Sequence, residues 1–281
     1  SSMVKKEYDT RNRLIRILKD SLLIVEYSYN NANQLTNKTF ANGVSSNMQY
    51  DFANRLSSIS TANGTIQNTS FTYDKEMNKT AITRNNNPSL SEQFTYDNGY
   101  RLTNYKRGPV GSPVIQNSYT YDAVGNRTLA NLNGTNTNYT INNLNQITAT
   151  SGGQNKSFTY DGRGNLTYDG IFYKTYDADG RLLKDSASPV NIIAYSYDAF
   201  NRRVITNTNG NPLKYTYSGV AQIEERDGTN NLLNKTVFTN FLSPVMNEKN
   251  GSLYYYHQNE LNSVEAISNN NGRLLERYQY D

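Results

Sequence analysis

A seven-residue phrase that begins Tyr-Asp recurs along nearly the whole chain, and this repeat limits the possible fold more than any other feature of the sequence. The intervals between neighbouring copies are about 16 to 25 residues. Such a spacing predicts an array of small, similar structural units. The phrase is clearest at 8–14, 50–56, 121–127 and 176–182, and weaker copies begin at Tyr29, Tyr73, Tyr96, Ile141, Tyr160 and Tyr197.

Each copy predicts a β-hairpin with a defined turn. A second aromatic residue commonly stands two positions before the first, which places both rings on one face of a strand. The Asp or Asn that follows suits the first position of a type I turn. In two copies the residue three positions later is Met77 or Tyr100, and we expect their turns to differ. The other eight copies have the Gly or Asn that favours left-handed backbone: Asn12, Asn33, Asn54, Gly125, Asn145, Gly164, Gly180 and Asn201.

The rest of each period predicts a second turn that joins one hairpin to the next. Helical patterns are nearly absent, and even residues 11–25 bunch their Leu and Ile as two strands would. We therefore expect an all-β fold of consecutive antiparallel β-hairpins. Because a flat sheet of so many strands would twist, the array should form a curved or spiralling sheet. The second turns are expected at the pairs 42–43, 63–64, 133–134, 152–153 and 209–210, which read Asn-Gly or Gly-Gly.

Composition limits the core and excludes several kinds of site. Only 36% of the 281 residues are hydrophobic and the mean hydropathy is −0.77, so a thick apolar core is not expected. The chain has no cysteine and His257 is its one histidine, which excludes thiolate and histidine clusters for a metal. A thinly spread net charge of +4 does not favour nucleic acid as a partner. No apolar run is long enough for a membrane span.

The Tyr-Asp phrase and its period resemble the YD repeat of the RHS family, which includes bacterial Rhs polymorphic toxins, the cocoon components of insecticidal Tc toxins and the teneurins. The array covers residues 4–212, and Ser1–Met3 are interpreted as a cloning remnant. Residues 213–281 continue the array and are similar to the family's RHS-associated core segment. The similarity rests on the stretches 217–219, 223–228, 250–257, 261–263, 271–273 and 278–281. The family commonly has Tyr-His-x-Asp-x-Leu-Gly-Ser there, whereas this chain has Asn259 for the Asp and Asn262 for the Gly.

The resemblance implies a structural role. In that family the repeats wind a β-sheet into a hollow shell that encloses a toxic C-terminal domain, and a downstream self-cleavage segment frees this cargo. We expect a fragment of the shell of a bacterial toxin that is secreted or at the cell surface. Its partner would be the C-terminal toxin cargo, which these residues do not include, and a secretion apparatus is a second partner that the resemblance allows. Exposed strand edges should favour self-association. The alternative is a surface adhesion module that binds carbohydrate or protein through exposed Tyr and Asn.

Candidate catalytic residues are few. His257 would need a nearby Ser or Thr and a carboxylate behind it, and no Gly-x-Ser-x-Gly phrase is present, so we predict a structural histidine at a strand end. The stretch 177–180 imitates the start of a calcium loop but lacks the distal ligands, and a plain turn is predicted. The serial Asp residues recur at equivalent turns, which favours a scaffold over a glycosidase pair. The sequence thus predicts no enzyme, no cofactor and no catalytic, cofactor-binding or metal site.

Overall fold

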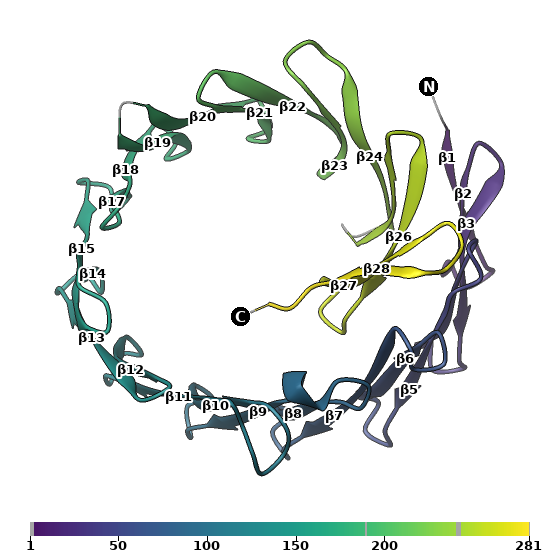
Figure 1. Ribbon diagram of the computed structural model, residues 1–281, viewed down its shortest axis with the longest axis horizontal. Helices are drawn as coiled ribbons and strands as arrows, with labels where there is room; N and C mark the ends of the chain where they lie inside the picture. The colour runs from purple at the N-terminus through teal and green to yellow at the C-terminus, as the bar shows by residue number, and fades with distance from the viewer. Residues whose placement is uncertain (1–2, 189, 240–242, 281) are drawn as a thin grey trace. The chain divides into compact units, whose positions relative to one another are not determined.

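The computed structural model describes residues 3–188, 190–239 and 243–280 (Figure 1). Over these residues the chain forms 28 β-strands and one short 3-10 helix, η1, at Pro88–Leu90. The strands follow one another in chain order within two sheets, β1–β15 and β16–β28, and the ladders between them are antiparallel. The predicted all-β array of consecutive hairpins is confirmed. No described helix is long and apolar enough to cross a membrane.

The strands are short, and most have five to eight residues. In the first sheet they are β1 Val4–Tyr8, β2 Leu14–Lys19, β3 Leu22–Tyr29, β4 Leu35–Phe40, β5 Ser45–Tyr50, β6 Leu56–Thr61, β7 Gln67–Tyr73, β8 Lys79–Arg84, β9 Glu92–Tyr96, β10 Leu102–Arg107, β11 Ile115–Tyr121, β12 Arg127–Leu132, β13 Thr135–Ile141, β14 Ile147–Gly152 and β15 Lys156–Ser157. In the second they are β16 Thr159–Tyr160, β17 Leu166–Tyr168, β18 Tyr173–Tyr176, β19 Leu182–Ser188, β20 Asn191–Tyr197, β21 Arg203–Thr208, β22 Asn211–Ser218, β23 Ala221–Arg226, β24 Leu232–Phe238, β25 Pro244–Lys249, β26 Ser252–Gln258, β27 Val264–Asn269 and β28 Leu274–Arg277.

The turns of the repeat have the predicted geometry. In the hairpin of β11 and β12, the Gly125 N–H donates to the Asp122 carbonyl at 3.2 Å, and Gly125 has φ of 97°. This is a type I turn followed by a left-handed residue, and the ladder register shifts next to it, as such a bulge requires. The left-handed backbone predicted at Gly164 and Gly180 is confirmed, with φ of 86° and 77°.

The expectation that two turns would differ is wrong. Met77 and Tyr100 adopt φ of 70° and 61°, as the Gly and Asn residues of the other copies do. Their backbones close the same bond, from Met77 N–H to the Asp74 carbonyl at 3.4 Å and from Tyr100 N–H to the Asp97 carbonyl at 3.0 Å. The Asp-led turn therefore sets the backbone conformation even where the side chain disfavours it.

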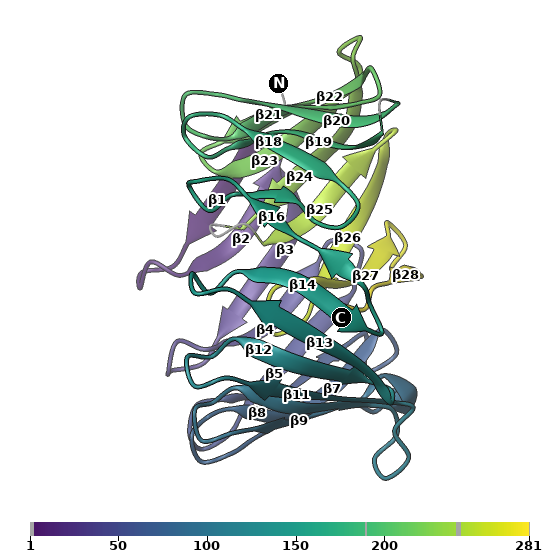
Figure 2. The same ribbon diagram turned by 90° about the vertical axis from the view of Figure 1, so that its left-hand side faces the viewer.

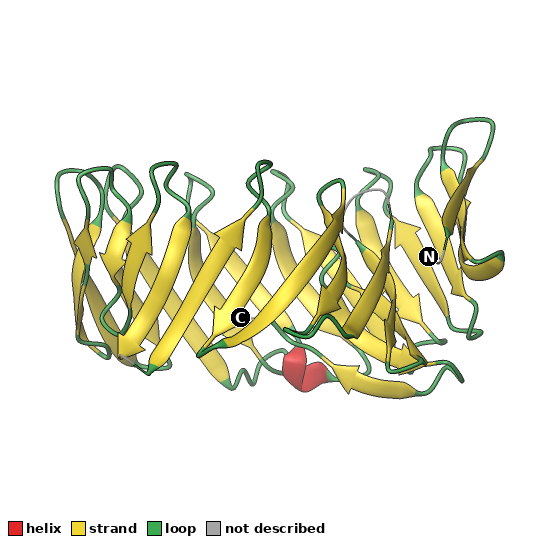
Figure 3. Cartoon of the chain, turned by 90° about the horizontal axis from the view of Figure 1, so that it is seen from above, coloured by secondary structure: helices red, strands yellow, loops and turns green. Residues whose placement is uncertain are grey.

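The second turns are also largely as predicted. Asn133-Gly134 and Asn209-Gly210 form two-residue loops with both φ angles positive, as in a type I′ turn. Residues 11–25 contribute to two strands, β2 and β3, rather than a helix. Successive turns alternate between the two ends of the strands (Figure 3). Within each sheet the repeat turns therefore lie at one end of the strands and the second turns at the other.

The chain divides into two compact units, and the first contains both of its ends. Unit 1 comprises residues 1–72, 82–87 and 215–281. In it the C-terminal strands β24–β27 pack against the N-terminal strands β2–β4 and bury a continuous apolar core (Figure 1). This core was not expected from the low hydrophobic content. It is formed by Leu14, Ile17, Ile24, Val25, Tyr27, Phe40, Val44, Ile66, Val237, Val245, Met246, Tyr255 and Ala266.

Unit 2 comprises residues 73–81 and 88–214 and is built differently. Its strands from β9 to β21 follow one another along an arc, each against its neighbours in the chain (Figures 1 and 2). Among its described residues, Ala130 is the one buried hydrophobic side chain. Unit 2 is thus a single curved layer, as the composition predicted, and its cohesion comes from ladders and side chains within the layer.

We expect a β-branched residue at Gly125 to destabilise unit 2. A Cβ at this position would meet no atom within 4 Å, so strain of the left-handed backbone is the main cost. Gly125→Val should lower the free energy of unfolding by about 1–2 kcal/mol, measured by urea denaturation. Gly125→Asn is the matched control and should be nearly neutral, because Asn201 occupies the equivalent position with φ of 62°. Equal effects of Val and Asn would contradict this assignment.

Candidate functional site: the repeat turns and the core of unit 1

Where the repeat has Asp, this residue organises its turn through both carboxylate oxygens. In unit 2, Asp97 Oδ1 accepts the N–H of Gly99 at 2.8 Å and that of Arg101 at 3.0 Å, and Oδ2 accepts Arg101 Nε at 2.7 Å. The Arg101 backbone N–H, followed by its guanidinium, holds the pKa of the Asp97 carboxyl below its usual range. Where the fifth residue is Asn, as in Asp122–Asn126, its amide replaces the guanidinium at 2.8 Å.

Where the repeat has arginine, arginine and tyrosine couple one hairpin to the next. The guanidinium of Arg101, held by Asp97, lies over the ring of Tyr121 with 5.0 Å between its Cζ and the ring centroid. The Tyr121 hydroxyl donates back to the carbonyl of Leu102 at 2.7 Å. The same hydroxyl-to-strand bond recurs in both units: Tyr29 to Leu14, Tyr50 to Leu35, Tyr96 to Lys79, Tyr160 to Ile147, Tyr176 to Leu166 and Tyr197 to Leu182.

These bonds explain why the repeat favours tyrosine, although one copy has Ile141 instead. A phenylalanine could fill the same space, but it could not satisfy the strand carbonyl. The ring of the same tyrosine also gives the guanidinium a flat surface to stack on, as in Arg13 over Tyr29 and Arg181 over Tyr197. The Asp-Arg-Tyr unit therefore works as a staple between neighbouring hairpins, and it can hold a sheet that has few aliphatic residues.

Polar contacts fasten the two halves of unit 1 around its apolar core. Lys19 Nζ pairs with Glu248 at 2.7 Å, next to the core on one side. On the other side Glu265 accepts Gln67 Nε2 at 2.6 Å and Arg84 Nε at 3.2 Å. Burial raises the pKa of the Glu265 carboxyl, and Arg84 opposes this rise. The C-terminal strands are thus held to the N-terminal strands by both apolar and charged groups.

His257 lies inside this core on β26 and is 1% exposed. Its Nε2 is 2.8 Å from Ser268 Oγ, its ring meets Phe40 edge to face at 4.9 Å between centroids, and its Nδ1 has no hydrogen-bond partner among the described residues. Burial, and secondarily the nearby Lys38 ammonium, lowers the pKa of the His257 imidazole to about 4. Burial also lowers the pKa of the Lys38 ammonium to about 8.

The contacts of His257 are those of a side chain packed in a protein core. The Ser268 hydroxyl is fully buried, so a substrate could not reach it. A histidine that activates a serine normally has a carboxylate on its other nitrogen, and no described side chain bonds to Nδ1 of His257. The structure therefore places the single histidine near the end of a strand, where the sequence predicted it, and deep in an interface that the sequence did not reveal.

The Asp-rich turn at 177–180 is a repeat turn. Asp177 accepts the N–H of Asp179 and of Arg181 at 2.9 Å each and the Arg181 guanidinium at 2.6 Å, so its oxygens are used within the turn. Across the described residues, no group of three His, Cys, Asp or Glu side chains could hold a metal ion. The stretch closes like the other repeat turns, with the Gly180 N–H donating to the Asp177 carbonyl at 3.1 Å.

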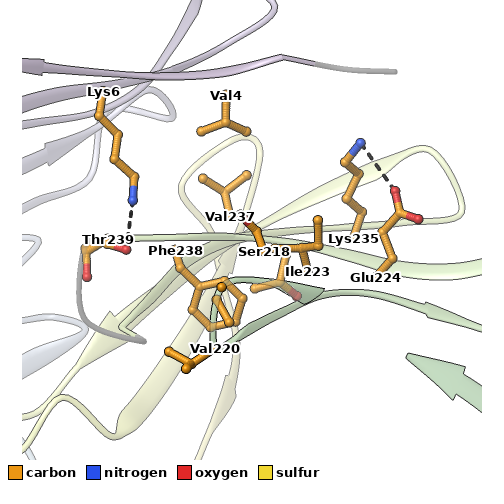
Figure 4. A pocket seen from close by; sticks show the side chains of 13 residues that line it. Val4, Lys6, Ser218, Val220, Ile223, Glu224, Lys235, Val237, Phe238 and Thr239 are labelled. Atoms are coloured by element: carbon orange, nitrogen blue, oxygen red, sulfur yellow. Dashed lines mark hydrogen bonds and ion pairs between the residues drawn. The ribbon is translucent and has the colours of Figure 1, made fainter. Parts of the chain in front are cut away.

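A cavity of about 720 Å³ opens in unit 1 between β1 and the pair β23 and β24 (Figure 4). Val4 and Val237 face each other across it, and Phe238 lies on its far side (Figure 4). Its charged groups are already bonded: Lys6 Nζ donates to the Thr239 carbonyl at 3.0 Å, and Lys235 pairs with Glu224 at 3.6 Å. Its apolar lining can accommodate an apolar group.

The repeat geometry and the two-layered core define a class of protein, the YD-repeat β-sheets. The profile of the Teneurin YD-shell family matches residues 62–281. The chain belongs to this family, and the resemblance to the RHS and YD-repeat proteins is confirmed.

Known relatives are much longer proteins. The tRNA3(Ser)-specific nuclease WapA of Bacillus spizizenii is 32% identical over 171 residues, which are 58% of this chain and 7% of that protein. The tRNA nuclease WapA of Bacillus subtilis is 30% identical over 171 residues, which again are 58% of this chain and 7% of that protein. The chain therefore matches only a small part of each nuclease.

Solved structures show the same fold. The Photorhabdus luminescens Tc holotoxin pore matches with a TM-score of 0.80 at 16% identity, covering 100% of this chain and 16% of that one. The TcdB2-TccC3-Cdc42 crystal structure matches with a TM-score of 0.79, also at 16% identity, over 17% of its chain. At this identity the likeness establishes the arrangement of strands.

Proposed function

We propose that this chain forms part of the wall of a shell that encloses a toxic C-terminal cargo, and that it acts without catalysis of its own. The observation that carries the proposal is the array of consecutive hairpins, which makes up most of unit 2 and continues in chain order through two sheets. A single-layered sheet with few buried side chains is poorly suited to an active site but well suited to a barrier. Membership in the YD-shell family and the fold shared with Tc toxin components support this reading.

The proposed setting is a secreted or surface-attached bacterial protein. The relatives with matching sequence are bacterial, and the matched solved structures include a toxin pore complex. The cargo would be a separate domain of the same polypeptide, and a secretion apparatus would be its second partner. Neither enclosing a cargo nor being secreted requires this segment to bind nucleic acid, and its net charge is only +4.

Protease protection in the full-length gene product tests the proposal. We expect the region enclosed by the shell to resist proteinase K in the intact protein and to be digested quickly after Phe40→Ala, which weakens the core of unit 1. Phe200→Ala is the matched control, because that ring is 79% exposed, and it should preserve protection. If the enclosed region is cut equally fast in the intact protein and in the Phe40 variant, the containment role is wrong.

A further inference from the structure

The hairpin that joins β25 to β26 turns at an exposed Asn-Gly pair. Asn250 and Gly251 form a two-residue loop between Lys249 and Ser252, with φ of 50° and 74°, as in a type I′ turn. In the part of the chain that the structure describes, neither the Asn250 amide nor the Gly251 N–H is hydrogen-bonded to another group. Both groups are therefore open to solvent and free to move relative to each other.

The chain has six other Asn-Gly pairs, and each of them has at least one of these two groups bonded. In two pairs both groups are bonded: Asn42 Nδ2 to Ser268 Oγ at 2.9 Å with Gly43 N–H to the Phe40 carbonyl at 2.9 Å, and Asn133 Oδ1 to the Gln116 N–H at 2.7 Å with Gly134 N–H to Asn131 Oδ1 at 2.9 Å. In four pairs one of the two groups is bonded: Gly64 N–H to the Thr61 carbonyl at 3.1 Å, Gly99 N–H to Asp97 Oδ1 at 2.8 Å, Asn209 Oδ1 to the Ile192 N–H at 2.7 Å and Gly272 N–H to the Asn269 carbonyl at 3.1 Å. The pair at 250–251 is thus the least restrained of those described.

The same two groups are the reactants of deamidation, a reaction that needs no enzyme. The glycine main-chain nitrogen gives up its proton and bonds to Cγ of the asparagine, and the side-chain nitrogen leaves with that proton as ammonia. Glycine has no Cβ to hinder this attack. Water then opens the cyclic imide at Cγ, which gives aspartate, or at the main-chain carbonyl carbon, which gives isoaspartate. A hydrogen bond on either reactant must open first, and each such bond slows the reaction by roughly two- to tenfold.

We propose that Asn250 is a site of spontaneous deamidation and that its isoaspartate product loosens the hairpin of β25 and β26. Isoaspartate carries the main chain through its side-chain carbon, so it lengthens the two-residue loop by one carbon atom. The register of Lys249 opposite Ser252 no longer fits such a loop. Both strands supply residues to the core of unit 1, Met246 and Tyr255 among them, so the change extends from the surface to the core. The site does not depend on the containment role.

Peptide mapping by mass spectrometry of the unaltered chain, incubated at mildly alkaline pH, tests the order of reaction. In the folded chain Asn250 should lose ammonia first, Asn42 and Asn133 should react at least about tenfold more slowly, and the other four pairs should lie between. In guanidinium chloride the seven rates should fall within about threefold of one another, because the protecting bonds are gone. The proposal is overturned if another pair reacts faster than Asn250 in the folded chain, or if the folded rates are as alike as the denatured ones.

Asn131→Ala is a variant that should gain reactivity at a different pair. It removes the acceptor of the Gly134 N–H and leaves the Asn133 side chain bonded to Gln116. Deamidation at Asn133 should therefore become roughly two- to tenfold faster, while the rate at Asn250 stays the same. An unchanged rate at Asn133 would show that hydrogen bonds do not set the order, which removes the basis for singling out Asn250.

Hydrogen exchange tests the effect of the product on the hairpin. The deamidated fraction is separated by ion exchange, and its isoaspartate is identified by methyl transfer from S-adenosylmethionine with an isoaspartyl methyltransferase. Amides of β25 and β26 should exchange about tenfold faster in this fraction than in the unaltered chain. Asn250→Asp is the matched control, because it adds the same charge without the extra main-chain atom, and its exchange should stay within about twofold. Equal exchange in the deamidated fraction and in Asn250→Asp would refute the loosening.

Discussion

Phe40→Ala should lower the free energy of unfolding of unit 1 by about 3–5 kcal/mol, the range for removing a fully buried aromatic side chain. Phe40 is 2% exposed and meets the rings of Tyr255 and His257 edge to face, with centroid distances of 6.0 Å and 4.9 Å. The substitution would remove the contacts of an N-terminal strand, β4, with β26, a strand that lies far along the sequence. Its effect should therefore be shared by both ends of the chain.

Hydrogen exchange is the measurement that separates this effect from general destabilisation. In the Phe40 variant, protection should fall together in β2–β4 and in β25–β27, whereas β11–β13 of unit 2 should keep theirs. Phe200→Ala, at an exposed turn, should change stability by no more than about 0.5 kcal/mol. Loss of protection confined to the N-terminal strands would show that the two halves of unit 1 unfold independently.

Acid should loosen the same core. The pKa of the His257 imidazole is lowered to about 4, against 6.5 for the unfolded chain, so the folded state favours the neutral ring. The stability that this provides is fully present above pH 6.5 and is lost as the pH falls towards 4. The loss should reach about 3 kcal/mol at pH 4, measured by urea denaturation at a series of pH values.

His257→Gln is the control for the acid effect. It removes the imidazole, so the decline of about 3 kcal/mol between pH 6.5 and 4 should disappear. Glu265 keeps its raised pKa in both proteins and acts in the opposite sense, because a raised carboxyl pKa adds stability as the pH falls. Below about pH 3.8 both proteins should weaken further, because the turn hydrogen bonds lower the pKa of carboxyls such as Asp97 and Asp177, and that stability is lost on protonation. An equally steep decline between pH 6.5 and 4 in the Gln variant would contradict the role of His257.

The local structure of this protein could be predicted from its sequence because each repeat contains the residues that determine its own strands and turn. The alternation of aromatic residues identifies the strands, and the Asp with its downstream Gly or Asn identifies the turn. Met77 and Tyr100 were misjudged because residue preference was given more weight than the turn. The Asp74 and Asp97 carbonyls accept the closing bonds in both cases, and this is enough to hold the left-handed backbone.

The core of unit 1 could not be predicted in the same way. Alternation shows which side chains share a face, but it does not show which distant strand will cover that face. A signal was present in composition: the apolar stretches 22–25 and 244–246 stand out in a polar chain, and both supply core residues. The same limit applies to His257, whose burial follows from that packing rather than from its own neighbours in the sequence.

The single-layered build of unit 2 has a consequence for how such proteins can change in size. Each of its hairpins is held mainly by contacts with the hairpin before it and the hairpin after it. Inserting or deleting a hairpin would therefore break the contacts at one junction and replace them with equivalent contacts at a new junction. Unit 1 lacks this freedom, because its two halves fit each other through one shared core. Relatives should therefore differ in length by whole repeats of the array, while the N- and C-terminal strands that form the core of unit 1 keep a constant length.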